Sequence, residues 1–371
     1  MADHATPEGT AAYQQRFGNH LAPDHFRAAF GLFVSSIGLG TYLGDPDTST
    51  DDAYRAAIDA ALRQGCNVID SAINYRFQRS ERVIGEALAT AFADATVRRD
   101  DVVIATKGGY LSFDTAPPRD PNRWFHETFV ATGVATFEDL VGGCHCMTPA
   151  YLQHQLAASL RNLRLHCVDI YYVHNPETQL GEIEPEVFHT RMRAAFAQLE
   201  DAVAAGQIRS YGVATWNGLR QPEDARDHLS LQTLLQLARD VAGDSHHFRV
   251  VQAPFNLAMP EAFARRNQRV GREVMSLLAA AQRLGITVVG SAAILQGQLS
   301  RRLPAPVSAA LPGLETEAQR AIQFARSAPG ITSALVGMKQ TRHVDENLAT
   351  ARVAGVGATG FAALFRESGA H

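Results

Sequence analysis

Three ionisable residues, Asp70, Lys107 and His174, each end a short apolar run of the kind that forms a buried strand. Tyr75 follows five residues after Asp70. A charge that ends an apolar strand is costly to bury unless it is paired, so Asp70 and Lys107 are expected to face each other. One such residue is most simply a strand-end charge that meets solvent, whereas three on consecutive strands indicate a site.

This set of side chains is suited to moving a proton. A tyrosine hydroxyl has a pKa near 10 and is a poor acid at neutral pH. The ammonium group of Lys107 is expected to stabilise the phenolate and to lower the pKa of Tyr75. Asp70 is expected to keep Lys107 charged and oriented, and His174 to donate to the substrate oxygen or to share the proton. The result is a general acid aimed at an oxygen that gains negative charge, as in reduction of a carbonyl by hydride.

The elements that position these groups form a repeating pattern. Eight short apolar runs predict strands, at 36–41, 67–70, 102–107, 169–174, 208–214, 250–253, 286–290 and 333–337. Amphipathic patterns between and after them predict helices at 51–63, 80–92, 148–163, 191–205, 231–241, 272–283, 315–326 and 344–353. Most strand ends are about forty residues apart, which favours a single (β/α)8 TIM barrel over residues 1–371, with 1–31 as an N-terminal extension. An open doubly wound sheet stays possible, because local patterns do not show closure.

The interval between the third and fourth strands is longer than the others. Residues 108–147 show no clear periodicity but carry several aromatic side chains, which argue against a disordered linker. We interpret this long loop as a lid over the carboxyl-terminal mouth of the barrel, with Trp124 and Phe125 as walls of a substrate pocket. A purely structural excursion, packed on the barrel exterior or at a subunit contact, is the alternative. Trp216, after the fifth strand, either lines the pocket or serves only to pack against neighbouring residues.

Composition limits the possible partners. The 371 residues are 46% hydrophobic and 19% charged, which excludes a disordered chain. The net charge of −4 gives no indication of a nucleic-acid or anionic-membrane partner, and no apolar run is long enough to predict a spanning helix. The amino terminus lacks an apolar signal-peptide core, and four cysteines do not make a disulfide scaffold in a chain of this length. We therefore expect a cytoplasmic protein; its oligomeric state is not indicated.

Two further motifs are weak. The glycines of GLGTYLG (residues 38–44) resemble a dinucleotide fingerprint, but the third comes one residue late and no acidic residue follows at the usual spacing. Gly38 and Gly40 are expected instead to make room at the barrel mouth. Cys144-His145-Cys146 has no fourth ligand at a standard spacing, so no metal site is predicted.

Taken together, the sequence resembles the aldo-keto reductase family. The matching segments are GLGTYLG (38–44), NVIDSAINYRFQRSERVIGEAL (67–88), VVIATKGG (102–109), DIYYVHNPE (169–177), VVQAPFNLAMPEA (250–262) and VGMKQTRHVDENLA (336–349). They occur in order over residues 32–353, nearly the whole chain. The resemblance implies a barrel that binds an extended nicotinamide cofactor across its mouth. It also implies that Asp70, Tyr75, Lys107 and His174 form the family's catalytic tetrad, with Tyr75 as acid in reduction and base in oxidation.

The resemblance also implies a set of cofactor contacts: Thr41, Thr215, Gln252, Ser291, Gly337, Lys339, Arg342, His343, Glu346 and Asn347. Gln252 matches the residue that contacts the nicotinamide carboxamide, and Glu346 and Asn347 match residues that reach the adenine. The family's Ser-Asn pair after strand five is replaced by Ala214-Thr215, and the tyrosine that stacks on nicotinamide after strand seven is missing, where the chain reads Gly290-Ser291-Ala292.

Three cations, Lys339, Arg342 and His343, lie where a 2′-phosphate is expected, although they could also simply sit at a helix start. They predict NADP, with NAD possible. The expected activity is an NAD(P)H-dependent oxidoreductase that interconverts carbonyls (aldehydes, ketones or sugars) and alcohols. The alternatives are an NAD-linked sugar dehydrogenase on the same scaffold and a cofactor-binding regulatory subunit.

Overall fold

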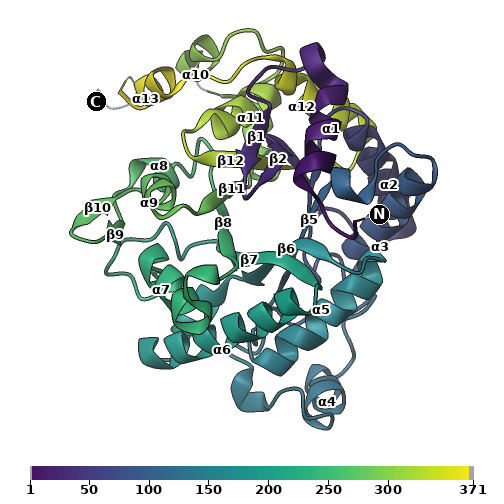
Figure 1. Ribbon diagram of the computed structural model, residues 1–371, viewed down its shortest axis with the longest axis vertical. Coiled ribbons are helices and arrows are strands. Elements are labelled where there is room, and N and C mark those ends of the chain that lie inside the picture. The colour runs from purple at the N-terminus through teal and green to yellow at the C-terminus, as the bar shows by residue number, and fades with distance from the viewer. Residues whose placement is uncertain (1, 304, 367–371) are drawn as a thin grey trace.

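The chain forms a closed barrel of parallel strands, as predicted (Figure 1). The computed structural model describes residues 2–303 and 305–366. The strands are β3 (Ile37–Gly40), β4 (Val68–Asp70), β5 (Val103–Gly108), β6 (Val168–His174), β7 (Ile208–Ala214), β8 (Phe248–Pro254), β11 (Thr287–Ser291) and β12 (Ile331–Gly337). Their order is β11-β12-β3-β4-β5-β6-β7-β8, and β8 pairs with β11 to close the barrel. The open sheet is excluded.

Helices surround the barrel and alternate with its strands. They are α2 (Thr48–Leu62), α3 (Arg79–Ala93), α5 (Pro149–Leu163), α6 (Pro185–Ala204), α7 (Leu231–Ala242), α9 (Leu277–Leu284), α11 (Glu317–Ser327) and α12 (Thr341–Leu348). Shorter helices are α8 (Glu261–Ala264), α10 (Ala305–Ala310) and α13 (Ala358–Arg366). Across the two described ranges, none of the helices combines the length and apolar character needed to cross a bilayer.

The helix predicted at 272–283 begins later than expected. A small hairpin of β9 (Gln268–Val270) and β10 (Glu273–Met275) takes up its first residues. Gly271 has φ 62 in the turn, a conformation that glycine adopts readily, and the Ser276 side chain then caps α9 by accepting from the Ala279 N–H. The apolar period extends across both elements, which is why the sequence did not separate them.

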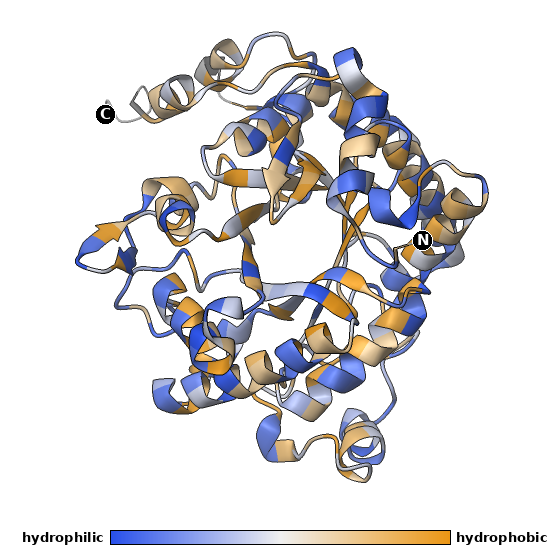
Figure 2. Ribbon diagram, in the orientation of Figure 1, coloured by the Kyte–Doolittle hydropathy of each residue, from blue (hydrophilic) through white to orange (hydrophobic). Residues whose placement is uncertain are grey.

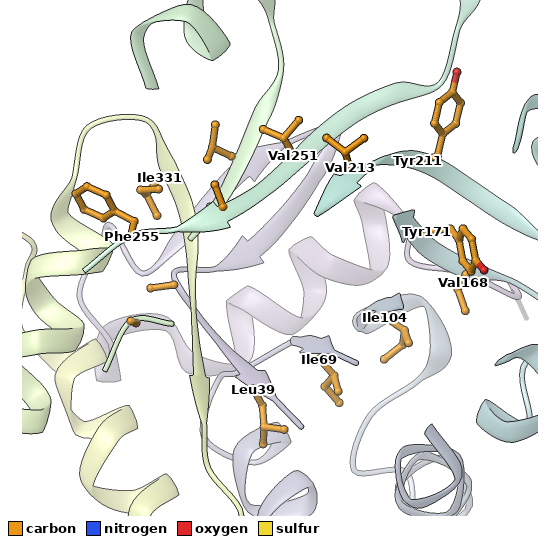
Figure 3. Packing of buried hydrophobic residues seen from close by; sticks show 14 of the residues in the cluster. Leu39, Ile69, Ile104, Val168, Tyr171, Tyr211, Val213, Val251, Phe255 and Ile331 are labelled. Carbon is orange, nitrogen blue, oxygen red and sulfur yellow. The ribbon is translucent and has the colours of Figure 1, made fainter. Parts of the chain in front are cut away.

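Side-chain alternation along the strands makes two separate cores. Outward-facing residues such as Leu39, Ile69 and Ile104 pack against the helices (Figure 3). Residues of the opposite parity, such as Val68 and Val103, fill the barrel. Figure 2 shows hydrophobic residues recurring along the strands, while the outer helices carry both kinds. Because Asp70, Lys107 and His174 share the inward parity, they continue the inner stack at the carboxyl ends of their strands.

The N-terminal extension has structure of its own that the sequence reasoning missed. Helix α1 (Pro7–Phe17) precedes a hairpin of β1 (Phe26–Ala29) and β2 (Leu32–Ser35), whose two turn residues, Phe30 and Gly31, have φ of 39 and 83. Ala29, Leu32 and Val34 belong to the cluster that fills the barrel interior. Since β2 leads directly into β3, the hairpin covers the amino-terminal end of the barrel.

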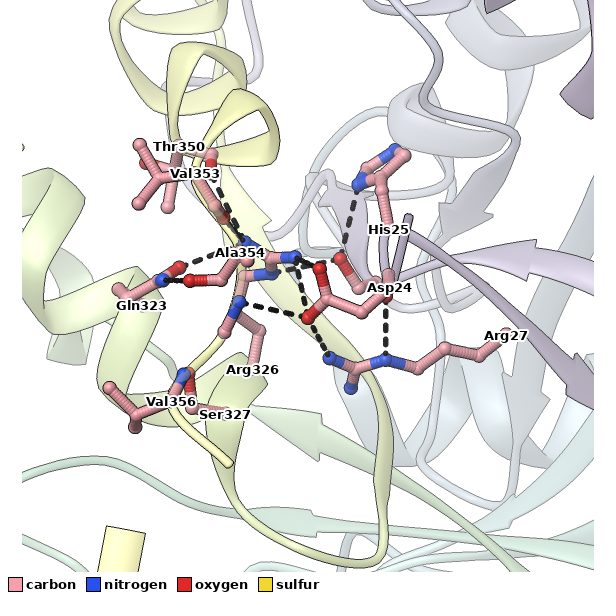
Figure 4. A network of polar contacts seen from close by, with 12 residues as sticks. Asp24, His25, Arg27, Gln323, Arg326, Ser327, Thr350, Val353, Ala354 and Val356 are labelled. Atoms are coloured by element: carbon pink, nitrogen blue, oxygen red, sulfur yellow. Dashed lines mark hydrogen bonds and ion pairs between the residues drawn. The ribbon is translucent and has the colours of Figure 1, made fainter. Parts of the chain in front are cut away.

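The buried side chain of Arg326, in α11, contacts residues on both sides of this hairpin and residues after α12 (Figure 4). The Arg326 side chain is fully buried; its Nε donates to the Ser36 hydroxyl at 2.9 Å, and its Nη1 donates to the carbonyls of Thr350 and Val353 at 3.1 and 2.9 Å. Asp24 is its ion-pair partner at 3.4 Å. Burial lowers the pKa of Arg326 to about 10, which leaves the guanidinium charged at neutral pH.

Residues 108–147 are more regular than the predicted loop. They contain α4 (Pro121–Phe125), followed by a π-helical turn over His126–Val130 and a 3-10 turn over Phe137–Asp139. Phe125 and Phe129 form a small separate core with other residues of this segment and with Tyr151 of α5. Figure 1 shows α4 beside α5 and α6, outside the ring of barrel strands.

Candidate active site

A cavity of about 410 Å³ opens at the carboxyl ends of the barrel strands. Its walls are Gly40, Thr41, Tyr42, Leu43, Asp70, Asn74, Tyr75, Tyr110, His174, Asn175, Ala214, Thr215, Trp216, Gln252, Ser291, Ala292, Ala293, Ile294, Gln296, Leu335 and Gly337. The predicted residues Tyr75, His174 and Asp70 therefore meet in one place. This position matches the site at which barrel enzymes carry their chemistry.

The floor of the cavity holds a buried ion pair. Lys107 Nζ lies 2.5 Å from Asp70 Oδ1 and 2.6 Å from the Ser71 carbonyl oxygen, so the predicted pair is present. Gln252 Nε2 donates to the other Asp70 oxygen at 2.8 Å. Burial lowers the pKa of Lys107, and the adjacent Asp70 charge opposes that shift. Asp70 thus has a partner on each oxygen, which fixes the orientation of its carboxylate. The carboxylate and the Ser71 carbonyl in turn orient the Lys107 ammonium.

Tyr75 lies above this pair and next to His174. Lys107 Nζ is 5.2 Å from the centroid of the Tyr75 ring, and the His174 ring stands edge-on to it at 5.9 Å. Burial, followed by the charge of Asp70, raises the pKa of Tyr75 well above 10, so the expectation that Lys107 lowers this pKa is wrong here. The Lys107 charge is already balanced by Asp70. Tyr75 therefore keeps its proton at neutral pH and can give it up only to an oxygen that is gaining negative charge.

His174 is neutral in this setting. Burial, and then the nearby charge of Lys107, lowers the pKa of its ring well below the usual value. Its Nδ1 is buried and has no hydrogen-bond partner within the described residues. A neutral imidazole beside a protonated phenol places two uncharged polar groups at the point where a substrate oxygen would lie.

The wall formed after β7 is held by a carboxylate that the sequence reasoning did not single out. Glu177 Oε1 accepts hydrogen bonds from the backbone N–H groups of Trp216, Asn217 and Gly218, at 2.8, 2.9 and 3.2 Å. Burial raises the pKa of Glu177. Its place directly after the β6 strand end, in His174-Asn-Pro-Glu177, was the available signal, because the ends of β6 and β7 are neighbours.

The predicted aromatic walls are only partly correct. Trp216 lines the cavity and is 41% exposed. Trp124 and Phe125 do not line it: Phe125 is buried in the small core of the 108–147 segment, and Trp124 faces a separate cleft beside α3 and α5. That segment contributes Tyr110 instead, whose ring stands edge-on to His174. Phe125, Phe129 and Trp124 pack in the core of the segment itself, which corrects the interpretation of Trp124 and Phe125 as substrate walls.

The predicted cofactor contacts divide into two groups. Thr41, Thr215, Gln252, Ser291 and Gly337 line the cavity. Lys339, Arg342, His343, Glu346 and Asn347 lie beyond it, from the end of β12 into α12. For the three cations among them, the described part of the chain contains no ion-pair partner within 4.0 Å. Gln252 is bound to Asp70, so its amide group belongs to the ion-pair network as well.

The weak motifs have structural explanations. A Cβ on Gly38 would lie 2.7 Å from the terminal methyl of Leu335, so glycine lets that side chain pack closely between neighbouring strands. Within residues 2–303 and 305–366, no group of three or more His, Cys, Asp or Glu side chains is placed to hold a metal ion.

The sequence is similar to those of known proteins. The model of the Aldo/keto reductase family matches residues 36–354. Prostaglandin-E(2) 9-reductase of Oryctolagus cuniculus is 27% identical over 198 residues, which cover 50% of this chain and 49% of that protein. The NADH-specific methylglyoxal reductase of Escherichia coli is 28% identical over 188 residues, 49% of each chain. The chain thus spans about half the length of these curated relatives.

Solved structures agree with the fold over a longer stretch. An aldo/keto reductase from Klebsiella pneumoniae in complex with NADP and acetate covers 93% of this chain and 95% of its own, with 21% identity and a TM-score of 0.61. The holo form of an aldo-keto reductase from Bacillus halodurans covers 92% and 95%, with 18% identity and a TM-score of 0.62. Since the family model matches most of the barrel, including every residue of the Asp70–Tyr75–Lys107–His174 site, the chain belongs to the aldo/keto reductase family.

Proposed function

We propose that this protein is an NAD(P)H-dependent oxidoreductase that interconverts carbonyl compounds and alcohols. The observation that carries the proposal is the protonated, partly buried Tyr75 above the Asp70–Lys107 pair, in a cavity at the barrel mouth. The family assignment and the NADP or NADPH bound by related structures support it.

The chain supplies proton transfer and orientation. A bound reduced nicotinamide supplies the hydride to the carbonyl carbon. The Tyr75 hydroxyl then gives its proton to the carbonyl oxygen as negative charge develops there, and in the oxidation direction it takes that proton back. The Asp70–Lys107 pair holds the floor beneath the Tyr75 ring in place, and neutral His174 shares the substrate oxygen.

The residues present fit such a cofactor. Thr215 Oγ1 is buried at the cavity wall and has no hydrogen-bond partner among the described residues, so it is available to a polar group of a ligand. Ser291 and Gly337 lie on the same wall, and the unpaired cations Lys339, Arg342 and His343 continue it outward along α12. We propose that these residues hold the nicotinamide end and the phosphate end, respectively.

NADP(H) is expected to bind about ten- to a hundredfold more tightly than NAD(H), because a charge-assisted hydrogen bond contributes about 1.5–3 kcal/mol. Dissociation constants from fluorescence titration measure this preference. The double variant Lys339→Ala/Arg342→Ala should reduce it, while Arg272→Ala, an exposed cation in the β9–β10 turn, serves as control. Equal or tighter binding of NAD(H) by the unaltered protein would refute the assignment; an NADH-specific relative shows that the family scaffold permits this outcome.

The activity itself is tested by following NADPH absorbance with a series of aldehydes and ketones, and NADP⁺ reduction with sugars and simple alcohols. Turnover in either direction that requires both cofactor and substrate is expected. If the dinucleotide binds tightly but no compound in either series turns over, the protein is a binding or regulatory subunit instead.

The setting proposed for this activity is a single barrel domain in the cytoplasm, acting on a small molecule. All four cysteines are free, as is usual in a reducing compartment. The net charge of −4 gives no support for a nucleic-acid partner.

A further inference from the structure

We propose that His145 is a positioning residue that holds the strand end bearing His174 in its catalytic place. The inference rests on the proposed function. The His145 side chain is fully buried and does not line the cavity. Its Nε2 lies 2.7 Å from the main-chain oxygen of His174, the last residue of β6. The contact thus reaches the catalytic histidine from behind, through its backbone.

The hydrogen-bond chain behind His145 fixes which ring nitrogen carries the proton. Arg191 Nη1 donates to Gln179 Oε1 at 2.7 Å, and a guanidinium is only a donor. The Gln179 amide nitrogen therefore faces His145. It donates to Nδ1 of the His145 ring at 3.0 Å and to the main-chain oxygen of His145 at 3.1 Å. With Nδ1 accepting, the proton is on Nε2, which donates to His174. Burial lowers the pKa of His145 to about 4, so this neutral form persists at working pH.

The strand end is held on two sides, and His145 supplies one of the two contacts. Asn175, the next residue, has a left-handed backbone with φ 44, and its N–H donates to the Ala214 oxygen of β7 at 2.6 Å, while the His174 oxygen binds His145. The unpartnered Nδ1 does not tie the His174 ring to the protein. Two tyrosine rings pack against it: Tyr75 at 5.9 Å, and Tyr110, which stands edge-on to His174 at 5.1 Å and to His145 at 5.2 Å. His145 thus contacts both the backbone and one aromatic neighbour of the catalytic ring.

The far end of the 108–147 segment is built around the same contact. Leu111 N donates to the Cys144 oxygen at 2.7 Å, and Cys146 N donates to the Gly109 oxygen at 2.9 Å. A Cβ on Gly109 would lie 2.8 Å from His145 Nε2 and 3.2 Å from the His174 oxygen, and the residue has φ 134. Glycine is required there for the two groups to meet. The segment therefore acts on the site by supporting it, whereas the predicted lid would have covered it.

Two substitutions of His145 separate positioning from mere stability. His145→Phe keeps a ring but removes the donor, and we expect kcat for carbonyl reduction to fall about 10- to 100-fold, the scale of a misplacement near 1 Å. His145→Gln keeps an N–H near the position of Nε2, and kcat should recover to within about threefold of the unaltered protein. The dissociation constant of NADPH should stay unchanged in both, because His145 lies away from the cavity.

Phe129→Leu is the matched control, since it loosens the core of the same segment without touching His145 or His174. It should lower the melting temperature and leave kcat unchanged. The positioning role is overturned if His145→Phe behaves like Phe129→Leu, or if His145→Gln is as impaired as His145→Phe.

A measurement that does not need turnover keeps this test separate from the proposed function. Nitrogen-15 NMR of the histidine rings should show His145 as the Nε2–H tautomer from about pH 5 to pH 8. The His174 ring signals should shift in His145→Gln less than in His145→Phe, and hardly at all in Phe129→Leu. An Nδ1–H tautomer, or protonation of His145 above pH 6, would overturn the inference even if His145→Phe fails to fold. Absence of turnover in the unaltered protein would count against the proposed function alone.

Discussion

Replacing Tyr75 with phenylalanine is expected to lower kcat for carbonyl reduction by about 10²- to 10⁴-fold, the usual contribution of a positioned general acid. The ring is kept, so the edge-on packing with His174 and the contact with the Lys107 ammonium survive. Only the proton donor is lost. Steady-state kinetics measure kcat, and fluorescence titration should show an unchanged dissociation constant for NADPH.

The comparison variant is Tyr42→Phe, which removes a hydroxyl from an exposed tyrosine of the same cavity. We expect it to lower kcat less than about tenfold. If Tyr75→Phe also retained more than a tenth of the activity, another group would have to be the acid, and neutral His174 would be the next to test.

Arg326→Met is expected to destabilise the fold by about 3–5 kcal/mol, the usual cost of leaving a buried ionic network without one partner. The methionine fills part of the volume but donates no hydrogen bond. The carbonyls of Thr350 and Val353 and the hydroxyl of Ser36 lose their donor in a buried place. Urea denaturation, monitored by circular dichroism, measures the free energy of unfolding.

A surface ion pair provides the control for this prediction. Arg283 pairs with Glu273 at 2.7 Å, but both side chains are at least half exposed. Arg283→Met should therefore cost less than about 1 kcal/mol. Equal losses for the two variants would mean that the Arg326 network contributes no more than a solvated pair.

The barrel and the meeting of Asp70, Lys107 and His174 at one end of it were predictable because both depend on local patterns. Short apolar runs identify strands that are buried on both faces, and each run ends at the edge where a site must lie. Asp70, Lys107 and His174 share the inward parity of their strands, a property that the period of two fixes in the sequence itself. The pairing of Asp70 with Lys107 followed from the cost of an isolated buried charge.

The parts that were not predictable depend on which partner a side chain finds across the fold. Phe125 is a residue type that often lines apolar pockets, yet its neighbours are other aromatic side chains of its own segment. The pKa of Tyr75 was expected to fall because Lys107 is near, but Asp70 already balances that charge and burial dominates. The hairpin β1–β2 was missed because its strands are four residues each, too short for a clear alternation, and only Ala29, Leu32 and Val34 of these residues join the cluster in the barrel interior.

Closure of the barrel pairs the first barrel strand with the last, Ile37 with Ala334. Such a contact joins distant parts of the chain, and forming it costs the entropy of closing a long loop. Asp70, Lys107 and His174 stand on three consecutive strands, so an open half-barrel of β3 to β6 already assembles the proton-transfer groups. The cations after β12 join them only when the ring closes. The proposed proton-transfer groups and the proposed cofactor cations therefore come from parts of the chain that are far apart in sequence, and the pairing of β12 with β3 brings the two sets to one mouth.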